Sequence, residues 1–157
     1  MYLYFLRHGE ADWPNWNKPD DARPLTDRGK KEMRKVAAFL KQLGLRLDQI
    51  ITSPLPRAEQ TARIAAEALG LKVHEEDLLL SGFSTKELKR LIKKYPGESV
   101  MLVGHEPDFT DVISALTGAR LKLSKGGLAL VDADIGEGCG RLLWLFPPKI
   151  AKAAARD

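Results

Sequence analysis

Two arginines and two histidines each follow closely on an apolar run with the composition of a buried strand; they are Arg7, His8, Arg57 and His105. In open α/β sheets ligands bind at the carboxyl ends of the strands, so we expect the four side chains to meet at one edge of a sheet. A guanidinium donates two parallel hydrogen bonds to a phosphate and keeps its charge. A neutral imidazole nitrogen is a competent nucleophile. Together these residues predict a pocket that holds and transfers a phosphoryl group.

His8 is the candidate nucleophile of this pocket. The cations Arg7 and Arg57 disfavour a protonated imidazole, so we expect the pKa of His8 to lie below its usual value. Gly9 lets the backbone turn sharply or approach a ligand closely, and we include it among the phosphate-binding residues. Phosphoryl transfer mainly requires positioning and neutralisation of the phosphate oxygens, which the arginines and His105 can supply without a metal.

Helical and strand-like segments alternate along the chain and indicate its fold. Helices are expected at 27–43, 56–69, 85–94 and 109–116, and strands at 2–6, 47–52, 71–73, 99–103, 127–132 and 141–146. This alternation predicts an α/β protein, a three-layer α/β/α sandwich around a mostly parallel sheet. Because a short turn joins the last two strands, at least one strand must be antiparallel.

The length predicts a single domain over residues 1–157, with a peripheral tail at 149–157 that is a short helix or frayed. No apolar run approaches the ~20 residues of a membrane span, and no signal-peptide pattern is present. Cys139 is the only cysteine, which excludes an intrachain disulfide and favours a cytoplasmic location. The net charge of +4 is spread along helices with acids between the bases, so nucleic-acid binding is not expected.

Four ordered motifs resemble the histidine phosphatase superfamily, the phosphoglycerate mutase-like group, over nearly the whole chain. They are Arg7-His8-Gly9-Glu10, Arg23-Pro24-Leu25-Thr26 with Gly29, Ser53-Pro54 with Arg57-Ala58 and Thr61-Ala62, and Gly104-His105 with Pro107. The short chain looks most like the small SixA-type phosphohistidine phosphatases. The resemblance implies that His8 is phosphorylated as a covalent intermediate. It also implies that Arg7, Arg57 and His105 complete the phosphate pocket, without a metal or organic cofactor.

The sequence leaves the general acid open. Larger members of the superfamily use a glutamate in the middle of the chain to protonate the leaving oxygen. The candidates here are Glu75, Glu76, Asp77 and Glu106, or none. An imidazole can leave phosphohistidine already protonated, so that substrate demands less of a general acid. This consideration favours phosphohistidine.

The leading functional prediction is a cytoplasmic, metal-independent phosphatase that acts on a phosphohistidine-bearing protein, such as a histidine-containing phosphotransfer domain, through a phosphoenzyme at His8. The chain lacks the long insertions that deepen the pocket of larger relatives, and a shallow site admits a protein surface. The alternatives are a phosphatase of small phosphate esters with the same pocket and a non-catalytic phospho-binding module. The expected partner is thus a phosphoprotein or a small ester, with no nucleic acid and no membrane, and a monomer is favoured.

Three smaller expectations concern residues near the pocket. Ser53 is expected to cap the helix that follows it rather than to contact the pocket. Trp13 and Trp16 belong to a polar loop at residues 11–23 that covers the site, and we expect them to pack within it. Glu10 either helps to orient the pocket or is a solvated loop acid.

Overall fold

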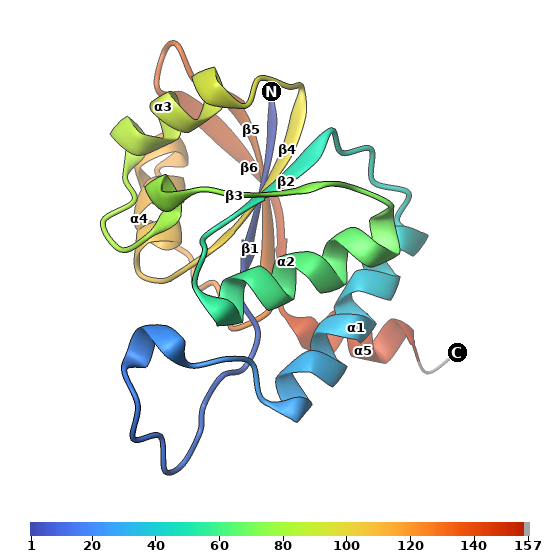
Figure 1. Ribbon diagram of the computed structural model, residues 1–157. Coiled ribbons are helices and arrows are strands. Elements are labelled where there is room, and N and C mark those ends of the chain that lie inside the picture. The colour runs from blue at the N-terminus through green and yellow to red at the C-terminus, as the bar shows by residue number, and fades with distance from the viewer. Residues whose placement is uncertain (156–157) are drawn as a thin grey trace.

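The computed structural model describes residues 1–155, in which a six-stranded sheet carries helices on both faces (Figure 1). The strands are β1 (Tyr2–Arg7), β2 (Gln49–Thr52), β3 (Val73–Glu75), β4 (Ser99–Gly104), β5 (Leu128–Asp134) and β6 (Cys139–Phe146). The helices are α1 (Asp27–Gln42), α2 (Pro56–Leu69), α3 (Thr85–Lys94), α4 (Asp108–Thr117) and α5 (Pro148–Ala154), with short 3₁₀ turns η1 (Asp20–Ala22) and η2 (Asp77–Leu79). The predicted α/β/α sandwich is confirmed.

The sheet order β3-β2-β4-β1-β5-β6 explains how the site is assembled. β4 pairs in parallel with both β1 and β2, and β2 with β3, whereas β5 is antiparallel to β1 and β6. One strand, β5, therefore runs against the other five, as the short final turn predicts. The carboxyl ends of the neighbours β2, β4 and β1 share one edge, and the chain leaves them toward Arg57, His105 and His8.

Two apolar layers fix the helices to the sheet. Alternate residues of β1 point to opposite faces. Leu3 and Phe5 pack into the layer under α3 and α4, and Tyr4 and Leu6 into the layer under α1, α2 and α5. Because β1 is buried on both faces, the residues that follow it start from a rigid support. Within residues 1–155 no helix is both long and apolar enough to cross a bilayer.

Local side-chain chemistry accounts for the helix ends. Thr26 caps α1 by accepting a hydrogen bond from the N–H of Gly29 (3.0 Å), as expected. Ser84 and Glu87 form a capping box at the start of α3. Gly70 ends α2 with a φ of +69°, a left-handed conformation that favours glycine. These local signals are the reason that the helix boundaries lie close to those predicted.

The C-terminal segment forms a short helix, one of the two alternatives predicted for residues 149–157, and this helix is packed rather than peripheral. Pro148 begins α5, because its restricted φ suits the first turn of a helix. Ala151 is completely buried, and α5 packs against α1 as part of the layer. A small side chain at this position allows the close approach. Residues 156 and 157 of the predicted tail lie outside the described residues.

Candidate active site

The structure brings the four predicted residues together at the carboxyl edge of the sheet. The rings of His8 and His105 lie 5.3 Å apart between centroids. The charges of Arg7 and Arg57 both reach these rings and lower the pKa of each. His8 is only 8% exposed and Arg57 only 7%. Two fixed cations beside one buried and one half-buried imidazole form a site suited to a phosphoryl dianion.

The backbone orients the ring of His8. Its Nδ1 lies 2.8 Å from the carbonyl oxygen of Gly9. A carbonyl oxygen can only accept a hydrogen bond, so Nδ1 carries the proton and Nε2 carries the lone pair. Nε2 is therefore the nitrogen that can attack phosphorus.

Gly9 links the segment of the nucleophile to helix α2. Its N–H donates to Oγ1 of Thr61 (3.1 Å), and that hydroxyl donates to the carbonyl oxygen of Arg57 (2.8 Å). A Cβ on Gly9 would lie 2.7 Å from Cγ of Met33, so glycine is required here by packing against α1. Through Thr61, helix α2 fixes the His8 segment and Arg57 relative to each other.

Burial is the main reason that both imidazoles have a pKa well below the usual value of a histidine, so that they stay neutral even in mild acid. Burial, followed by the positive charges nearby, lowers the pKa of His8 to about 3 against the opposing hydrogen bond to Gly9. It also lowers the pKa of His105 to about 4, with Arg57 as the next largest cause. The direction agrees with the prediction, but the predicted cause, repulsion by cations, is secondary to desolvation.

The neutral histidines should make the fold less stable in acid. In the unfolded chain they bind a proton near pH 6.5, whereas in the fold His8 binds one only near pH 3 and His105 near pH 4. Between these values the unfolded state binds more protons, so the free energy of unfolding should fall as the pH drops below about 6.5, by up to about 1.4 kcal/mol per pH unit for each histidine. Urea unfolding at pH 7 and pH 5 measures this loss. We expect a smaller loss in His8→Gln; the same pH dependence in wild type and variant would contradict the assignment.

Ser53 contacts the site, which corrects its predicted role as a helix cap. It is completely buried, and its Oγ lies 2.8 Å from Nε2 of His105. The N-cap position of α2 belongs instead to Leu55, which has no side-chain cap bond; its N–H donates to Oγ of Ser53 (3.3 Å). Ser53 therefore positions the ring of His105. The position of Ser53 in the Ser53-Pro54 motif, next to the other site residues, was the feature of the sequence that could have indicated this contact.

Ser53→Ala should lower kcat by about tenfold, because a hydrogen bond of about 1–1.5 kcal/mol that orients His105 is lost. The variant should keep its thermal unfolding midpoint within a few degrees, since a single neutral hydrogen bond is removed. Hydrolysis of p-nitrophenyl phosphate between pH 5 and pH 8 should show the fall in kcat, little change in KM and a displaced acid limb. An unchanged kcat and pH profile would remove Ser53 from the positioning of His105.

Asp20 holds Arg57, and nothing in the sequence singled it out. Nη1 of Arg57 donates to the backbone carbonyl of Asp20 (3.0 Å), and Nη2 reaches the carboxylate (3.4 Å). Nε of Arg57 is buried and has no hydrogen-bond partner in the part of the chain that the structure describes. The turn η1 thus covers Arg57 and takes up two of its donor groups, while Nε retains donor capacity.

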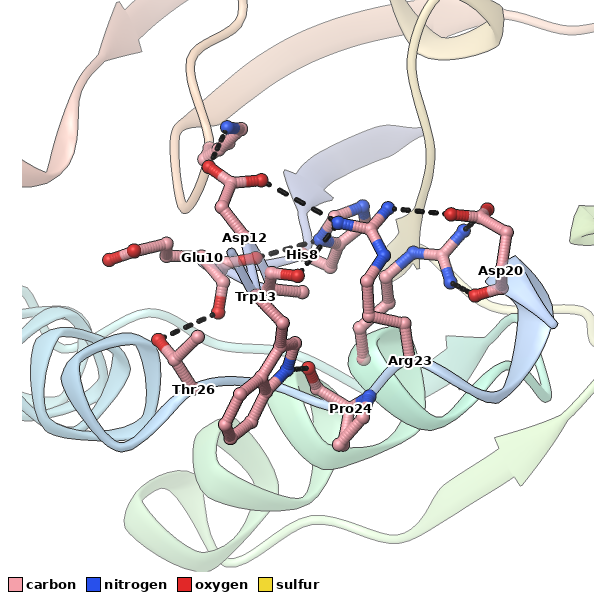
Figure 2. A network of polar contacts seen from close by, with 12 residues as sticks. His8, Glu10, Asp12, Trp13, Asp20, Arg23, Pro24 and Thr26 are labelled. Carbon is pink, nitrogen blue, oxygen red and sulfur yellow. Dashed lines mark hydrogen bonds and ion pairs between the residues drawn. The ribbon is translucent and has the colours of Figure 1, made fainter. Parts of the chain in front are cut away.

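A row of alternating charges ties the 11–23 loop together beside His8 (Figure 2). Nη2 of Arg23 pairs with Asp20 (3.0 Å), and Nη1 donates to the carbonyl of Ala11 (2.7 Å). Asp12 pairs with Arg23 (3.6 Å) and with Lys125. Arg23 therefore joins both arms of the loop, and this accounts for its place in the second motif.

The loop tryptophans make their polar contacts within or next to the loop. Nε1 of Trp13 donates to the carbonyl of Pro24 (2.9 Å), and Nε1 of Trp16 to that of Pro19 (3.0 Å). The two rings lie 6.2 Å apart between centroids. The contacts tie both rings to the loop, but Trp13 is 39% exposed, so the expected packing is only partial for that ring. Glu10, left open by the sequence, lies within 3.6 Å of Arg28.

Glu76 is a structural carboxylate. It is buried and accepts hydrogen bonds from Nζ of Lys94 (2.6 Å) and from the N–H of Leu78 (3.0 Å). Burial alone would raise the pKa of Glu76, but these hydrogen bonds outweigh it and hold the pKa below its usual value. The group is therefore ionised at neutral pH and fixes the start of η2.

The other three general-acid candidates have surroundings that differ from those of Glu76. Glu106 accepts a hydrogen bond from the N–H of Thr110 (2.8 Å) in the first turn of α4. Glu75 and Asp77 are exposed. Across residues 1–155, no cluster of three or more His, Cys, Asp or Glu side chains is placed to hold a metal ion. Metal independence stays a prediction.

Known proteins resemble this chain in sequence and in fold. Residues 3–80 match the model of the histidine phosphatase superfamily (branch 1). An uncharacterised protein of Picosynechococcus sp. is 39% identical over 137 residues, which cover 82% of each chain. The phosphohistidine phosphatase SixA homolog of Haemophilus influenzae is 28% identical over 136 residues, 79% of this chain and 82% of its own. A structure of the protein histidine phosphatase SixA complexed with tungstate has a TM-score of 0.81 and 26% identity, over 96% of this chain and 99% of that one.

Sequence and geometry contribute separately to the assignment. The first three motifs fall within the matched residues 3–80, whereas the motif with His105 lies beyond them. The fold connects His105 to the matched motifs, because β4 pairs with β1 and places His105 next to His8. The chain therefore belongs to the histidine phosphatase superfamily, branch 1, as a SixA-like phosphatase.

Proposed function

We propose that this protein removes the phosphoryl group from a phosphohistidine on another protein, such as a histidine-containing phosphotransfer domain, through a phosphoenzyme at His8. The observation that carries the proposal is the state of the His8 ring. It is buried and neutral at pH 7, and its Nδ1 proton is held by the carbonyl of Gly9. The similarity to the phosphohistidine phosphatase SixA homolog of Haemophilus influenzae and to the structure of the protein histidine phosphatase SixA supports the choice of substrate.

The first chemical step transfers the phosphoryl group to the enzyme. A bond forms from Nε2 of His8 to phosphorus as the P–N bond of the substrate breaks, and the substrate imidazole leaves with a proton that it already carries. Arg7 and Arg57 neutralise the phosphate oxygens in the transition state. The arriving dianion raises the pKa of His105 and so favours its protonated form, in which both ring nitrogens can donate hydrogen bonds.

The second step restores the enzyme. A water oxygen attacks the phosphorus on His8, the bond to Nε2 breaks, and Nε2 recovers its lone pair while the water protons remain with phosphate and solvent. Neither step needs a strong acid at the leaving group when the substrate is a phosphohistidine. The contacts of Glu76 with Lys94 and of Glu106 with Thr110 support that substrate over an ester, whose oxygen must be protonated as it leaves.

We further propose a cytoplasmic site of action. Cys139 is an exposed, free thiol, and such a group is preserved in a reducing compartment.

A paired assay tests the substrate class. Wild type and His8→Gln are given a phosphorylated histidine-containing phosphotransfer domain and a panel of small phosphate esters, with EDTA present throughout. We expect loss of the protein phosphohistidine to depend on His8 and its kcat/KM to exceed that of any ester by on the order of 100-fold or more. The reverse preference would make the protein a small-molecule phosphatase. No hydrolysis of either the phosphoprotein or the esters would favour a phospho-binding module.

A further inference from the structure

A basic groove adjoins the active site on the side of Arg7. Its volume is about 440 Å³. Its charged lining residues are Arg7, Lys122, Lys125, Lys149, Lys152 and Glu32. Five cations thus face one carboxylate in a cavity that shares Arg7 with the phosphate pocket.

The sheet explains why the segment with Lys122 and Lys125 lies there. β5 is antiparallel to β1 and begins with Leu128 opposite Leu6, so the residues before β5 lie at the carboxyl end of β1. The N–H of Gly126 lies within hydrogen-bonding distance of the carbonyl oxygens of Arg7 (3.1 Å) and His8 (3.0 Å). This wall of the groove is therefore tied to the segment that holds the nucleophile.

The opposite wall of the groove is formed by the segment that follows β6, and the pairing of β6 with β5 brings this segment to the same edge of the sheet. β6 is antiparallel to β5 and ends with Phe146 opposite Leu128, so Pro147 and Lys149 emerge beside the first wall. The buried Ala151 then fixes α5 against α1. The groove is thus built on ordered elements.

Only some of its cations are neutralised. Lys125 pairs with Asp12, and Lys152 with Glu32 (2.7 Å). Lys122 and Lys149 are exposed and form no ion pair within residues 1–155. Nη1 of Arg7 donates to the carbonyl of Leu123 (3.0 Å), and its charge is not balanced by a carboxylate in the same residues. The unbalanced charge extends from the phosphate pocket to the rim of the groove.

We propose that this groove binds an acidic segment of the phosphoprotein substrate, close to its phosphohistidine. The inference rests on the proposed function, because it describes the partner that reaches the same site. Lysines act as point charges on flexible stems and suit a run of carboxylates better than one fixed phosphate. The lining includes Pro147 and Pro148 but no aromatic ring on which a nucleic-acid base could stack. An acidic protein surface fits this chemistry.

A charge-reversal pair tests the proposal. The double variant Lys122→Glu with Lys149→Glu is compared with Lys89→Glu with Lys93→Glu, two exposed lysines of α3 on the other face of the sheet. Both pairs change the net charge equally. The probe is a fluorescein-labelled deca-glutamate peptide, measured by anisotropy at low salt. We expect its affinity to fall at least about tenfold in the groove variant and less than about twofold in the control.

Catalysis supplies the second measurement. Turnover of p-nitrophenyl phosphate should be unchanged in both variants, because Lys122 and Lys149 lie outside the phosphate pocket. KM for the phosphorylated phosphotransfer domain should rise in the groove variant alone, and the difference should shrink as salt is added. Equal peptide affinities in the two variants, or tighter binding of an RNA oligonucleotide of the same charge than of the peptide, would overturn the proposal. If wild type fails to dephosphorylate the protein, the proposed function is wrong, whereas peptide binding still decides the groove.

Discussion

His8→Gln should abolish turnover of every substrate while leaving the fold intact. Glutamine is close in size to histidine and can fill the buried position, but its amide has no nucleophilic lone pair comparable to that of Nε2. Arg7, Arg57 and His105 would still bind phosphate, so the loss should fall on kcat. We expect a decrease on the order of 10⁴-fold or more, as for other nucleophiles whose removal stops covalent catalysis.

The matched control for this variant is His74→Gln. His74 is the one histidine of the chain outside the site. Its ring lies against Tyr95 (5.3 Å between centroids). The same chemical change should therefore leave turnover within about twofold of wild type, as expected of a residue outside the reacting centre. Substantial turnover by His8→Gln with a normal unfolding curve would refute the covalent mechanism.

Arg57→Ala should weaken inhibition by vanadate, a phosphate-like anion, by on the order of 30-fold or more. A charge-assisted hydrogen bond between a buried guanidinium and an anion contributes about 2 kcal/mol or more, and alanine removes it entirely. Arg57→Lys should recover only part of the affinity, because an ammonium lacks the planar fork that matches a phosphate. Inhibition constants for the three proteins measure both effects.

Asp20→Ala separates the two functions of Arg57. Arg57 also holds the turn η1, so its removal disturbs the loop as well as the anion site. Asp20 is exposed, and its carboxylate lies 3.4 Å from Nη2 of Arg57, a distance typical of a weak ion pair. We expect Asp20→Ala to change vanadate inhibition by less than about threefold. An effect as large as that of Arg57→Ala would mean that the arginine acts through the loop.

The parts of the fold that were predicted are those encoded by neighbouring residues. Thr26 and Gly70 lie at helix ends because their own side chain, or its absence, suits the local backbone. Apolar runs marked β1 and β4 because both strands are buried on two faces. Once the strands were placed, sheet topology required His8 and His105 to meet.

The parts that were not predicted depend on contacts between distant segments. Asp20 reaches Arg57 across 37 residues from an irregular loop, and no periodicity marks such a pair. Ser53 contacts His105 only after β2 and β4 lie side by side. The dominant cause of the low pKa of His8 is desolvation, which depends on how the layers close over the ring. The packing of α5 likewise follows from Ala151 meeting α1, a partner more than 100 residues earlier in the chain.

Regular elements hold the nucleophile and Arg57 in place, whereas an irregular loop completes the surroundings of Arg57. β1 and the carbonyl of Gly9 fix the nucleophile, and α2 fixes Arg57 to it through Thr61. The 11–23 loop completes the surroundings of Arg57 from an exposed position. Rigid support gives the reacting nitrogen a defined orientation.

Trapping the phosphoenzyme tests covalent catalysis at His8 directly. Wild type is mixed with a histidine-containing phosphotransfer domain that carries a ³²P-labelled phosphohistidine, or with the labelled ester that it hydrolyses fastest. The reaction is quenched with alkali within milliseconds. We predict an alkali-stable, acid-labile label on the enzyme, no more than one per chain, which mass spectrometry assigns to His8 and which His8→Gln lacks. An active enzyme that carries no label, or carries it on His105 or another residue, would contradict a phosphoenzyme at His8.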